Sequence, residues 1–283
     1  MPAAIMRPML TRRPLLLGPL VTVLASLPAA RPALAQQRRS LADPLRLGVD
    51  TALADSGLAR ALQQAFGRDT GIAVQRVRQP ATAMLEALER GELDAGLCNA
   101  PDAEAQLDKQ GLVHDRQAIA RGDFVIVGPA GRGKAGDPAR IGGLHDAALA
   151  LQRLRDAALA APGLITFLTA NDGSGAHVAE QALWRAAKVA PAAPWFVAAA
   201  PGQGLAQQAR ARGAYAVVER GAWNVQGGGP LAVLVEADPA LAEEVHVMRA
   251  FRVTHPAGKI FVAWIASAKG RRVAAGVRGY RAP

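Results

Sequence analysis

Hydrophobic positions follow two alternating patterns along the chain from Leu45 onward. Short runs of aliphatic and β-branched residues, typical of buried strands, precede stretches in which apolar residues recur every three or four positions, as on one face of a helix. The strands expected on this basis span residues 45–49, 72–77, 93–98, 124–127, 165–168, 195–197, 215–218, 231–235 and 245–253, and the helices 56–67, 81–90, 144–160, 174–186, 204–211 and 258 onward. Repeated strand–helix units predict an α/β fold with largely parallel sheets. The glycine- and charge-rich segment 130–137 is expected to be a surface loop.

The N-terminal segment has the pattern of an export signal. Three arginines precede an apolar run at 15–27, and residues 33–35 (Ala-Leu-Ala) have the small-x-small form of a cleavage site. The run is too short for a comfortable membrane span and is interrupted by proline. Residues 11–17 also look like a twin-arginine signal, although paired arginines occur in ordinary secretory signals too. We therefore expect a signal peptide at 1–35, a linker at 36–43, a periplasmic location, and no stable membrane insertion after cleavage.

The composition of the chain argues against several classes of binding site. The formal net charge is +10, and it falls to about +6 without the signal. The arginines are scattered among helices and no basic cluster is interleaved with aromatic residues, so nucleic-acid binding is not supported. Cys98 is the only cysteine, which rules out an internal disulfide and a thiolate metal cluster, and its flanks indicate a buried thiol. The histidines show no metal-ligand spacing, and no cofactor is expected.

The segment 166–184 carries the clearest candidate site. A short strand leads into a polar, glycine-containing turn, and an amphipathic helix starts near Ser174. The free N–H groups and the positive dipole end of such a helix favour an anion, and the hydroxyls of Ser174 and Thr169 add donors. The plainer alternative is an ordinary capped helix. Similar turns at 50–56 and 202–204 are weak signals individually, but two α/β domains with a cleft would bring several such turns around one ligand.

Taken in order, several segments resemble the periplasmic tungstate-binding proteins of ABC importers. The resemblance rests on SGLARALQQAFGRDTGIAVQRV, GELDAGLCNAPDAEAQLDKQG, GDFVIVGP, NDGSGAH with LW after it, GQGL, GAYAVVERG, LAVLVEADP and FVAWIASAKGRR. It implies an α/β, two-lobed type II periplasmic-binding-protein fold, in which each lobe is a mainly parallel sheet flanked by helices and the ligand cleft lies between the lobes. Lobe 1 would comprise 44–123 and 247–283, and lobe 2 would be the insertion 124–246. The implied partners are a small oxyanion, tungstate or similar, and an ABC permease, and a monomer is expected.

The resemblance implies a ligand site with clear departures from the family pattern. The implied ligand-binding residues are Thr51, Ser56, Thr169, Ser174, Gly175 and Arg220. The family has Thr-Thr-Thr-Ser in its first loop, where this chain has Val49, Asp50, Thr51 and Ala52, and Ala170 stands at the position of a family arginine. Arg121 or Arg220 are possible replacement cations. Losing one charge-assisted donor costs about 1.5–3 kcal/mol, or roughly tenfold to a hundredfold in affinity. A ligand of lower charge, or a small organic acid or amide, is also compatible with the remaining donors.

Three functions follow as hypotheses. The first is an exported solute-binding protein that captures a tungstate- or molybdate-type oxyanion and delivers it to an ABC importer. The second keeps the fold for a sensory or degenerate binding protein with a different small ligand. The third is a hydrolase that uses Ser174, with His177 three residues later. Its sequence Gly173-Ser174-Gly175 lacks the spacing of a nucleophile elbow, so we expect no enzyme activity.

Overall fold

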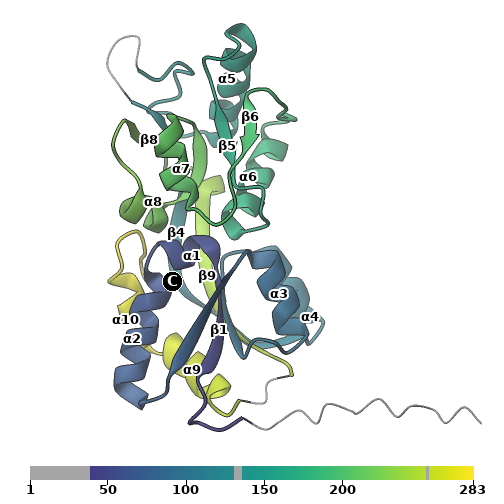
Figure 1. Ribbon diagram of the computed structural model, residues 1–283, viewed down its shortest axis with the longest axis vertical. Helices are drawn as coiled ribbons and strands as arrows, with labels where there is room; N and C mark the ends of the chain where they lie inside the picture. Colours follow the sequence, from purple (N-terminus) through teal and green to yellow (C-terminus); the bar gives the residue numbers. More distant parts are fainter. Residues whose placement is uncertain (1–38, 131–135, 253–254) are drawn as a thin grey trace, which may run out of the picture. The chain divides into compact units, whose positions relative to one another are not determined.

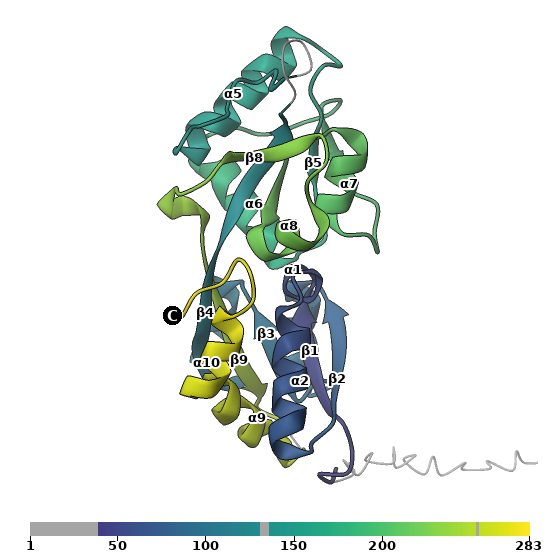
Figure 2. The same ribbon diagram turned by 90° about the vertical axis from the view of Figure 1, so that its left-hand side faces the viewer.

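A computed structural model describes residues 39–130, 136–252 and 255–283, and Figures 1 and 2 show it from two perpendicular directions. The expected signal peptide, the start of the expected linker and most of the expected loop 130–137 lie outside these ranges. The strands are β1 (Leu45–Asp50), β2 (Val74–Gln79), β3 (Ala95–Cys98), β4 (Val113–Pro129), β5 (Phe167–Thr169), β6 (Phe196–Ala198), β7 (Ala216–Glu219), β8 (Leu231–Val235) and β9 (Ala242–Ala250). The helices are α1 (Thr51–Asp55), α2 (Leu58–Thr70), α3 (Ala81–Glu89), α4 (Pro101–Lys109), α5 (Ala147–Ala160), α6 (Gly175–Ala186), α7 (Leu205–Arg212), α8 (Arg220–Gln226), α9 (Ala257–Ala266) and α10 (Ala268–Ala275), and η2 (Pro239–Leu241) is a short 3₁₀ turn.

Most strands join one large sheet in the order β2-β1-β3-β9-β4-β7, and β8 also pairs with β4. The neighbours β2, β1 and β3 are parallel, and so are β5 and β6, which form a separate two-stranded sheet. By contrast, β9 is antiparallel to β3 and β4, and β4 is antiparallel to β7 and β8. The expectation of parallel sheets therefore holds for the strand–helix units, whereas the strands that leave one half of the fold and return to it must run in opposite directions.

Two separate sets of apolar residues form the core. One set is drawn from residues 45–120 and 245–280 and the other from residues 124–241, and we call the parts of the chain around them lobe 1 and lobe 2. In lobe 1, α2, α9 and α10 cover one face of the sheet while α3 and α4 cover the other (Figure 1). In lobe 2, α5 and α6 pack on one side of the sheet and α7 packs on the other. Each lobe is thus a sheet with helices on both faces.

The strands β4 and β9 link the two lobes. β4 is 17 residues long, runs through both halves in Figures 1 and 2, and pairs with β9 from Val113 to Asp123. Its residues Val113 and Ile119 lie in the core of lobe 1, and Phe124 and Ile126 lie in that of lobe 2. The chain therefore crosses between the lobes on two adjacent antiparallel strands.

Several element boundaries differ from those expected. The expected strand 124–127 is only the apolar end of β4, because residues 114–118 in the first half are mostly polar and alternate between half-buried and exposed. Helix α4 was not expected; it starts at Pro101 without a side-chain cap, so the usual start signal is missing. Helix α2 passes through the expected stop at Gly67 and ends at Gly71, whose φ of 71° suits a glycine C-cap. The single terminal helix expected from residue 258 is two helices, because Ser267 caps α10.

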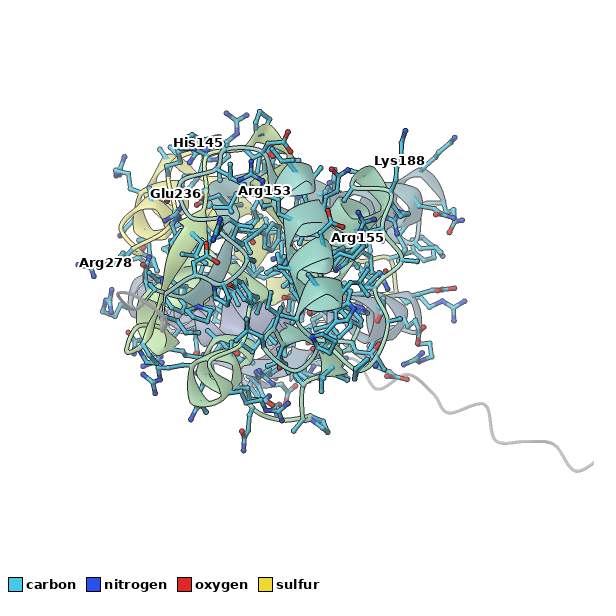
Figure 3. All side chains as sticks on the ribbon, turned by 90° about the horizontal axis from the view of Figure 1, so that it is seen from above. His145, Arg153, Arg155, Lys188, Glu236 and Arg278 are labelled. Atoms are coloured by element: carbon cyan, nitrogen blue, oxygen red, sulfur yellow. The ribbon has the colours of Figure 1, made fainter. Side chains whose placement is uncertain are left out.

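The charged surface is spread over several elements. Seen from above lobe 2, the labelled Lys188, just after α6, projects outward, and the labelled Arg153 and Arg155 lie on α5 (Figure 3). Arg155 pairs with its neighbour Asp156 at 2.6 Å, and their side chains are 36% and 64% exposed. Within the described ranges, no helix is long and apolar enough to cross a membrane.

The lone thiol, Cys98, is buried, as predicted.

Candidate functional site

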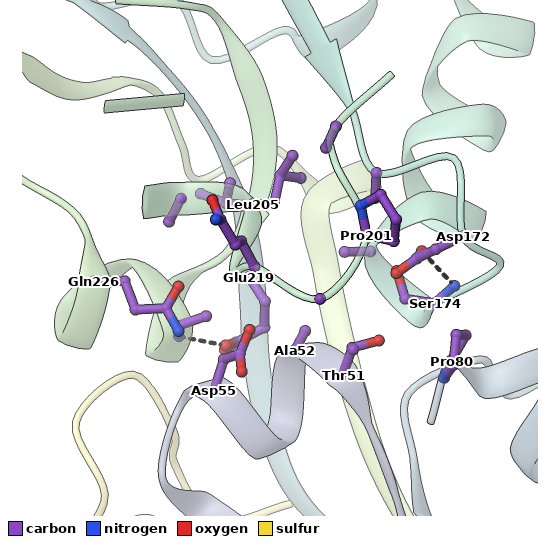
Figure 4. A pocket seen from close by; sticks show the side chains of 18 of the residues that line it. Thr51, Ala52, Asp55, Pro80, Asp172, Ser174, Pro201, Leu205, Glu219 and Gln226 are labelled. Carbon is purple, nitrogen blue, oxygen red and sulfur yellow. Dashed lines mark hydrogen bonds between the residues drawn. The ribbon is translucent and has the colours of Figure 1, made fainter. Parts of the chain in front are cut away.

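A cavity of about 410 Å³ lies between the lobes (Figure 4). Its lobe 1 wall comes from the start of α1 and the end of β2, and its lobe 2 wall comes from the turns after β5 and β6 and from α7 and α8. The lining residues are Thr51, Ala52, Asp55, Arg78, Pro80, Ala170, Asn171, Asp172, Ser174, Ala176, Ala199, Ala200, Pro201, Gly202, Gln203, Leu205, Ala206, Val218, Glu219, Ala222 and Gln226. The carboxyl ends of strands β1, β2, β5, β6 and β7 supply most of them, which is where open α/β sheets bind ligands.

Two of the expected ligand residues face this cavity from opposite lobes. Thr51 begins α1 directly after β1, and its hydroxyl has no hydrogen-bond partner among the described residues. Ser174 is the N-cap of α6: its Oγ accepts a hydrogen bond from the His177 N–H at 3.3 Å, and its own N–H donates to Asp172 Oδ1 at 2.9 Å. The expected strand, turn and helix at 166–184 is therefore present. The plainer alternative, a helix capped by Ser174, is also present, and Ser174 lines the cavity as well as capping α6.

Gly175 and Thr169 lie next to the cavity but outside its lining. Gly175 is the first residue of α6, and its backbone is so close to Asn99 that a Cβ would collide with the Asn99 side-chain oxygen. Thr169 ends β5; it is 3% exposed, and its hydroxyl has no hydrogen-bond partner among the described residues.

Ser56 and Arg220 are not part of the cavity lining. Both side chains are hydrogen-bonded to other parts of the protein. The Ser56 hydroxyl donates to Leu53 O at 2.9 Å and accepts from the Tyr280 hydroxyl at 2.8 Å, which ties α1 to the C-terminal segment. Arg220 donates to Asp123 and Glu236, and these carboxylates raise the pKa of its guanidinium. The other replacement cation considered, Arg121, is half exposed and pairs with Glu244 at 3.4 Å.

Asp50 is a cap rather than an unpaired charge beside the ligand. It is 0% exposed, its Oδ1 accepts from the Ala52 N–H at 2.9 Å, and its Oδ2 accepts from the Gly175 N–H at 3.0 Å. The carboxylate therefore joins the start of α1 in lobe 1 to the start of α6 in lobe 2. Burial raises the pKa of Asp50 to about 6, although the two backbone hydrogen bonds lower it.

A second carboxylate, Glu219, caps another helix at the cavity. It accepts from the N–H groups of Gly221 and Ala222, each at 2.6 Å, at the start of α8. Burial raises its pKa to about 7. The nearby Glu243 of β9 accepts from Asn99 Nδ2 at 2.6 Å, and burial, together with the charge of Glu219, raises the pKa of Glu243. These acids make the hinge side of the cavity rich in buried carboxyl groups.

The lining contains four charged residues, Asp55, Arg78, Asp172 and Glu219, and sequence reasoning named none of them as a ligand residue. Arg78, near the end of β2, pairs with Asp55 of α1, with Nη2 to Oδ2 at 3.0 Å. Its position at the carboxyl end of a parallel strand is the signal that would have found it. Asp172 precedes the α6 cap and is held there by the Ser174 N–H.

The geometry does not form a nucleophile–base pair from Ser174 and His177. The Ser174 hydroxyl is used by the His177 backbone, while His177 Nδ1 accepts from the Gly173 N–H at 3.0 Å. Partial burial lowers the pKa of His177. The residues described also contain no cluster of three or more His, Cys, Asp or Glu side chains suited to a metal ion.

Comparison with known proteins gives the chain a family. A protein of Haloferax volcanii provisionally named an ABC transporter anion-binding protein is 33% identical over 178 residues, which span 62% of this chain and 49% of that protein. The chain thus spans about half the length of this relative. The tungstate-binding protein TupA of Peptoclostridium acidaminophilum is 27% identical over 80% of this chain and 78% of its own.

Structures agree with these relatives. The crystal structure of the tungstate ABC transporter from Geobacter sulfurreducens is similar with a TM-score of 0.69 and 27% identity, over 82% of this chain and 98% of that one. The two-lobed type II periplasmic-binding-protein fold expected from sequence is therefore confirmed. The family model described as the PBP superfamily domain matches residues 35–268. The match covers well over half of the sequence, and the chain belongs to the PBP superfamily.

Proposed function

We propose that this protein is an exported solute-binding protein that captures a small anion, of the tungstate or molybdate type, and delivers it to an ABC importer. The observation that carries the proposal is the cavity between the lobes, which Thr51 of lobe 1 and Ser174, the N-cap of α6 in lobe 2, both line. Hydroxyl and backbone N–H donors at a helix N-terminus are suited to an oxyanion. The names of the relatives, a tungstate-binding protein and an anion-binding protein of an ABC transporter, support the same class.

Capture would work by hinge closure. We take 44–123 with 247–283 as one moving body and 124–246 as the other, joined by β4 and β9. A ligand that contacts both bodies favours the closed form only by the contacts that exist in that form alone. Contacts from Thr51 on one side and α6 on the other meet this requirement. No chemical step is needed, and the solute is released unchanged to the permease, with export through the twin-arginine or the ordinary secretory route.

A small organic acid is the second candidate ligand. The cavity volume of about 410 Å³ is in the range of clefts that hold small organic molecules. Much of the lining is small and apolar, including Ala170, Ala199 and Ala200. An organic anion would place its apolar part against these residues, whereas a tetrahedral oxyanion would leave much of the volume to water. The same fold would then serve uptake or sensing of a different solute.

A binding panel on the mature protein tests the proposal. Thermal shift and calorimetry would use tungstate, molybdate, sulfate, phosphate and small carboxylates, because a ligand that binds only the folded state raises the apparent stability. We expect tungstate or molybdate to raise the melting temperature of the wild type and to do so less for Thr51→Val. Leu159→Ala, an exposed residue of α5 in lobe 2, is the matched control. Stabilisation by carboxylates alone would favour the second candidate, and no response to any oxyanion would contradict the first.

A further inference from the structure

Two hydrogen bonds join the lobes at the edge of the cavity. The Gly175 N–H of lobe 2 donates to Asp50 Oδ2 of lobe 1 at 3.0 Å, and the Thr82 N–H of lobe 1 donates to Gly173 O of lobe 2 at 3.1 Å. Both contacts lie at the turn that starts α6. The Asp50 side chain is fully buried there, so its carboxylate fills the space in front of the Gly175 N–H.

A bound oxyanion would need the same donor. The first N–H groups of a helix lack partners within the helix and point toward a negative group placed at its N-terminus. In α6, the Gly175 N–H is taken by Asp50, and the His177 N–H by the Ser174 hydroxyl. At α8, Glu219 takes the N–H groups of Gly221 and Ala222 in the same way. The chain's own carboxylates thus occupy the positions that an anion would use.

Resting on the proposed function, we propose that Asp50 acts as an internal anion that competes with the oxyanion for the N-terminus of α6, so that capture requires protonation of the Asp50 carboxyl. Asp50 is then the residue that sets which ligand charge the site accepts. With Asp50 ionised, a dianion meets a like charge and finds the Gly175 N–H already bonded. With Asp50 protonated, the Oδ2 atom is a weaker acceptor, and the donor becomes available.

The surroundings of Asp50 strengthen this competition. The titratable groups whose charges interact with Asp50 include Asp172 from the α6 turn, Glu243 from β9 and Cys98 from β3. All three are acids, so none of them offsets the negative charge of Asp50. Burial raises the pKa of Asp50 to about 6, so the carboxyl is mostly ionised at neutral pH.

Proton linkage predicts how strongly the apparent affinity for the oxyanion depends on pH. Where only the protonated form binds, the apparent affinity falls up to tenfold for each pH unit above the pKa of Asp50. At pH 7.5, about one to two pH units above this pKa, the penalty is on the order of tenfold to a hundredfold. Each oxyanion captured at that pH would bring close to one proton with it.

Calorimetry with molybdate, and with sulfate as a second dianion, tests both consequences. Titrations in buffers of different ionisation enthalpy count the protons taken up. For the wild type at pH 7.5 we expect close to one proton per molybdate and an affinity that weakens from pH 6.5 to 8. For Asp50→Asn we expect binding at least tenfold tighter at pH 7.5, no proton uptake, and little pH dependence. Asp55→Asn removes a carboxylate from the same cavity without touching α6, and it should keep the proton uptake of the wild type.

Each outcome decides between the alternatives. Binding by the wild type with no proton uptake and no pH dependence would overturn the inference, as would weaker binding by a folded Asp50→Asn. If Asp50→Asn does not fold by circular dichroism, Asp50→Thr takes its place in the same titrations, with the same expected results. If neither the wild type nor the Asp50 variants bind any oxyanion between pH 5.5 and 8, the proposed oxyanion function itself is overturned. That result differs from oxyanion binding without proton uptake, which would leave the proposed function intact.

Discussion

The guanidinium of Arg220 donates two hydrogen bonds to the Asp123 carboxylate, at 2.7 and 2.6 Å, where β4 passes from lobe 1 into lobe 2. Glu236 accepts a third at 2.7 Å. The side chains of Arg220 and Asp123 are 25% and 21% exposed, so the pair is largely shielded from water. A cation bonded in this way stabilises the hinge, and its guanidinium is held outside the lining of the cavity.

Arg220→Gln should therefore lower stability rather than affinity. Asp123 would lose its charged partner in a partly buried position, which costs about 1–3 kcal/mol. Urea unfolding measures this loss, and anion titration should give a dissociation constant within about threefold of the wild type. Arg155→Gln is the matched control, because its pair with Asp156 is exposed and contributes little. A large loss of affinity with unchanged stability would show that Arg220 contacts the ligand after all.

Glu180 should make stability depend on pH. This α6 residue is 1% exposed, its Oε1 accepts from Trp184 Nε1 at 3.2 Å, and burial raises its pKa to about 8. In the unfolded chain the carboxyl titrates near pH 4.5. The folded state therefore holds one more proton between these pH values, and stability falls as the pH rises through the window, by at most about 1.4 kcal/mol per unit.

Glu180→Gln removes this titration while keeping the side-chain shape. We expect the variant to gain stability relative to the wild type as the pH rises from 5 to 8.5, in melting curves taken at several pH values. Glu86→Gln, an exposed position on α3, should follow the wild-type profile. A parallel profile for Glu180→Gln would mean that the carboxyl is already ionised in the folded protein at neutral pH.

The two cavity hydroxyls should differ in their effects. Thr51→Val removes a hydroxyl that has no partner among the described residues, so the free energy of unfolding should change by less than about 0.5 kcal/mol while anion affinity falls roughly tenfold. Ser174→Ala removes the α6 cap as well, so it should cost about 1 kcal/mol of stability in addition to affinity. Paired unfolding and binding measurements separate the two roles. Equal loss of stability in both variants would contradict the assignment of Thr51.

Gly175 should control how closely the lobes approach. A Cβ there would collide with the Asn99 side chain of lobe 1, so Gly175→Ala should push the start of α6 away from lobe 1. Overpacking of this kind costs about 1–3 kcal/mol. Small-angle scattering should report a larger radius of gyration for the ligand-free variant. Gly142→Ala, where the nearest neighbouring atom is at 3.6 Å, should leave both quantities unchanged.

Sequence patterns predicted the elements whose signals are local. The turn from β5 into α6 was expected within a residue or two, because an apolar strand, a polar turn and the Ser174 cap all occur within one short stretch. The first half of β4 was missed because its pairing with β9, rather than its own hydrophobicity, keeps it extended. The role of Asp50 was missed for a related reason: its partner Gly175 is distant in the sequence and meets it only once the lobes are folded.

The same limit applies to the cations of the site. Arg220 and Arg121 were considered because arginine suits an anion, yet their partners Asp123, Glu236 and Glu244 are set by the strand register and not by spacing. Arg78 meets Asp55 through the parallel pairing of β1 and β2. The pairing of the strands decides which arginines are bonded to carboxylates. The sequence therefore identifies residues that could donate to a ligand, but not which of them are already hydrogen-bonded within the protein.

The pairing of β3 with β9 has a consequence for the order in which the protein assembles. Residues 95–98 pair with residues 246–249, so the sheet of lobe 1 is completed by a strand made after the whole of lobe 2. Lobe 2 is continuous in sequence from β4 to η2 and can collapse first, as domains often do during synthesis. Lobe 1 must wait for a long-range contact, which is the slower kind to form. Until β9 arrives, one edge of β3 is left open, and this newly made chain is the form most exposed to proteolysis and mispairing.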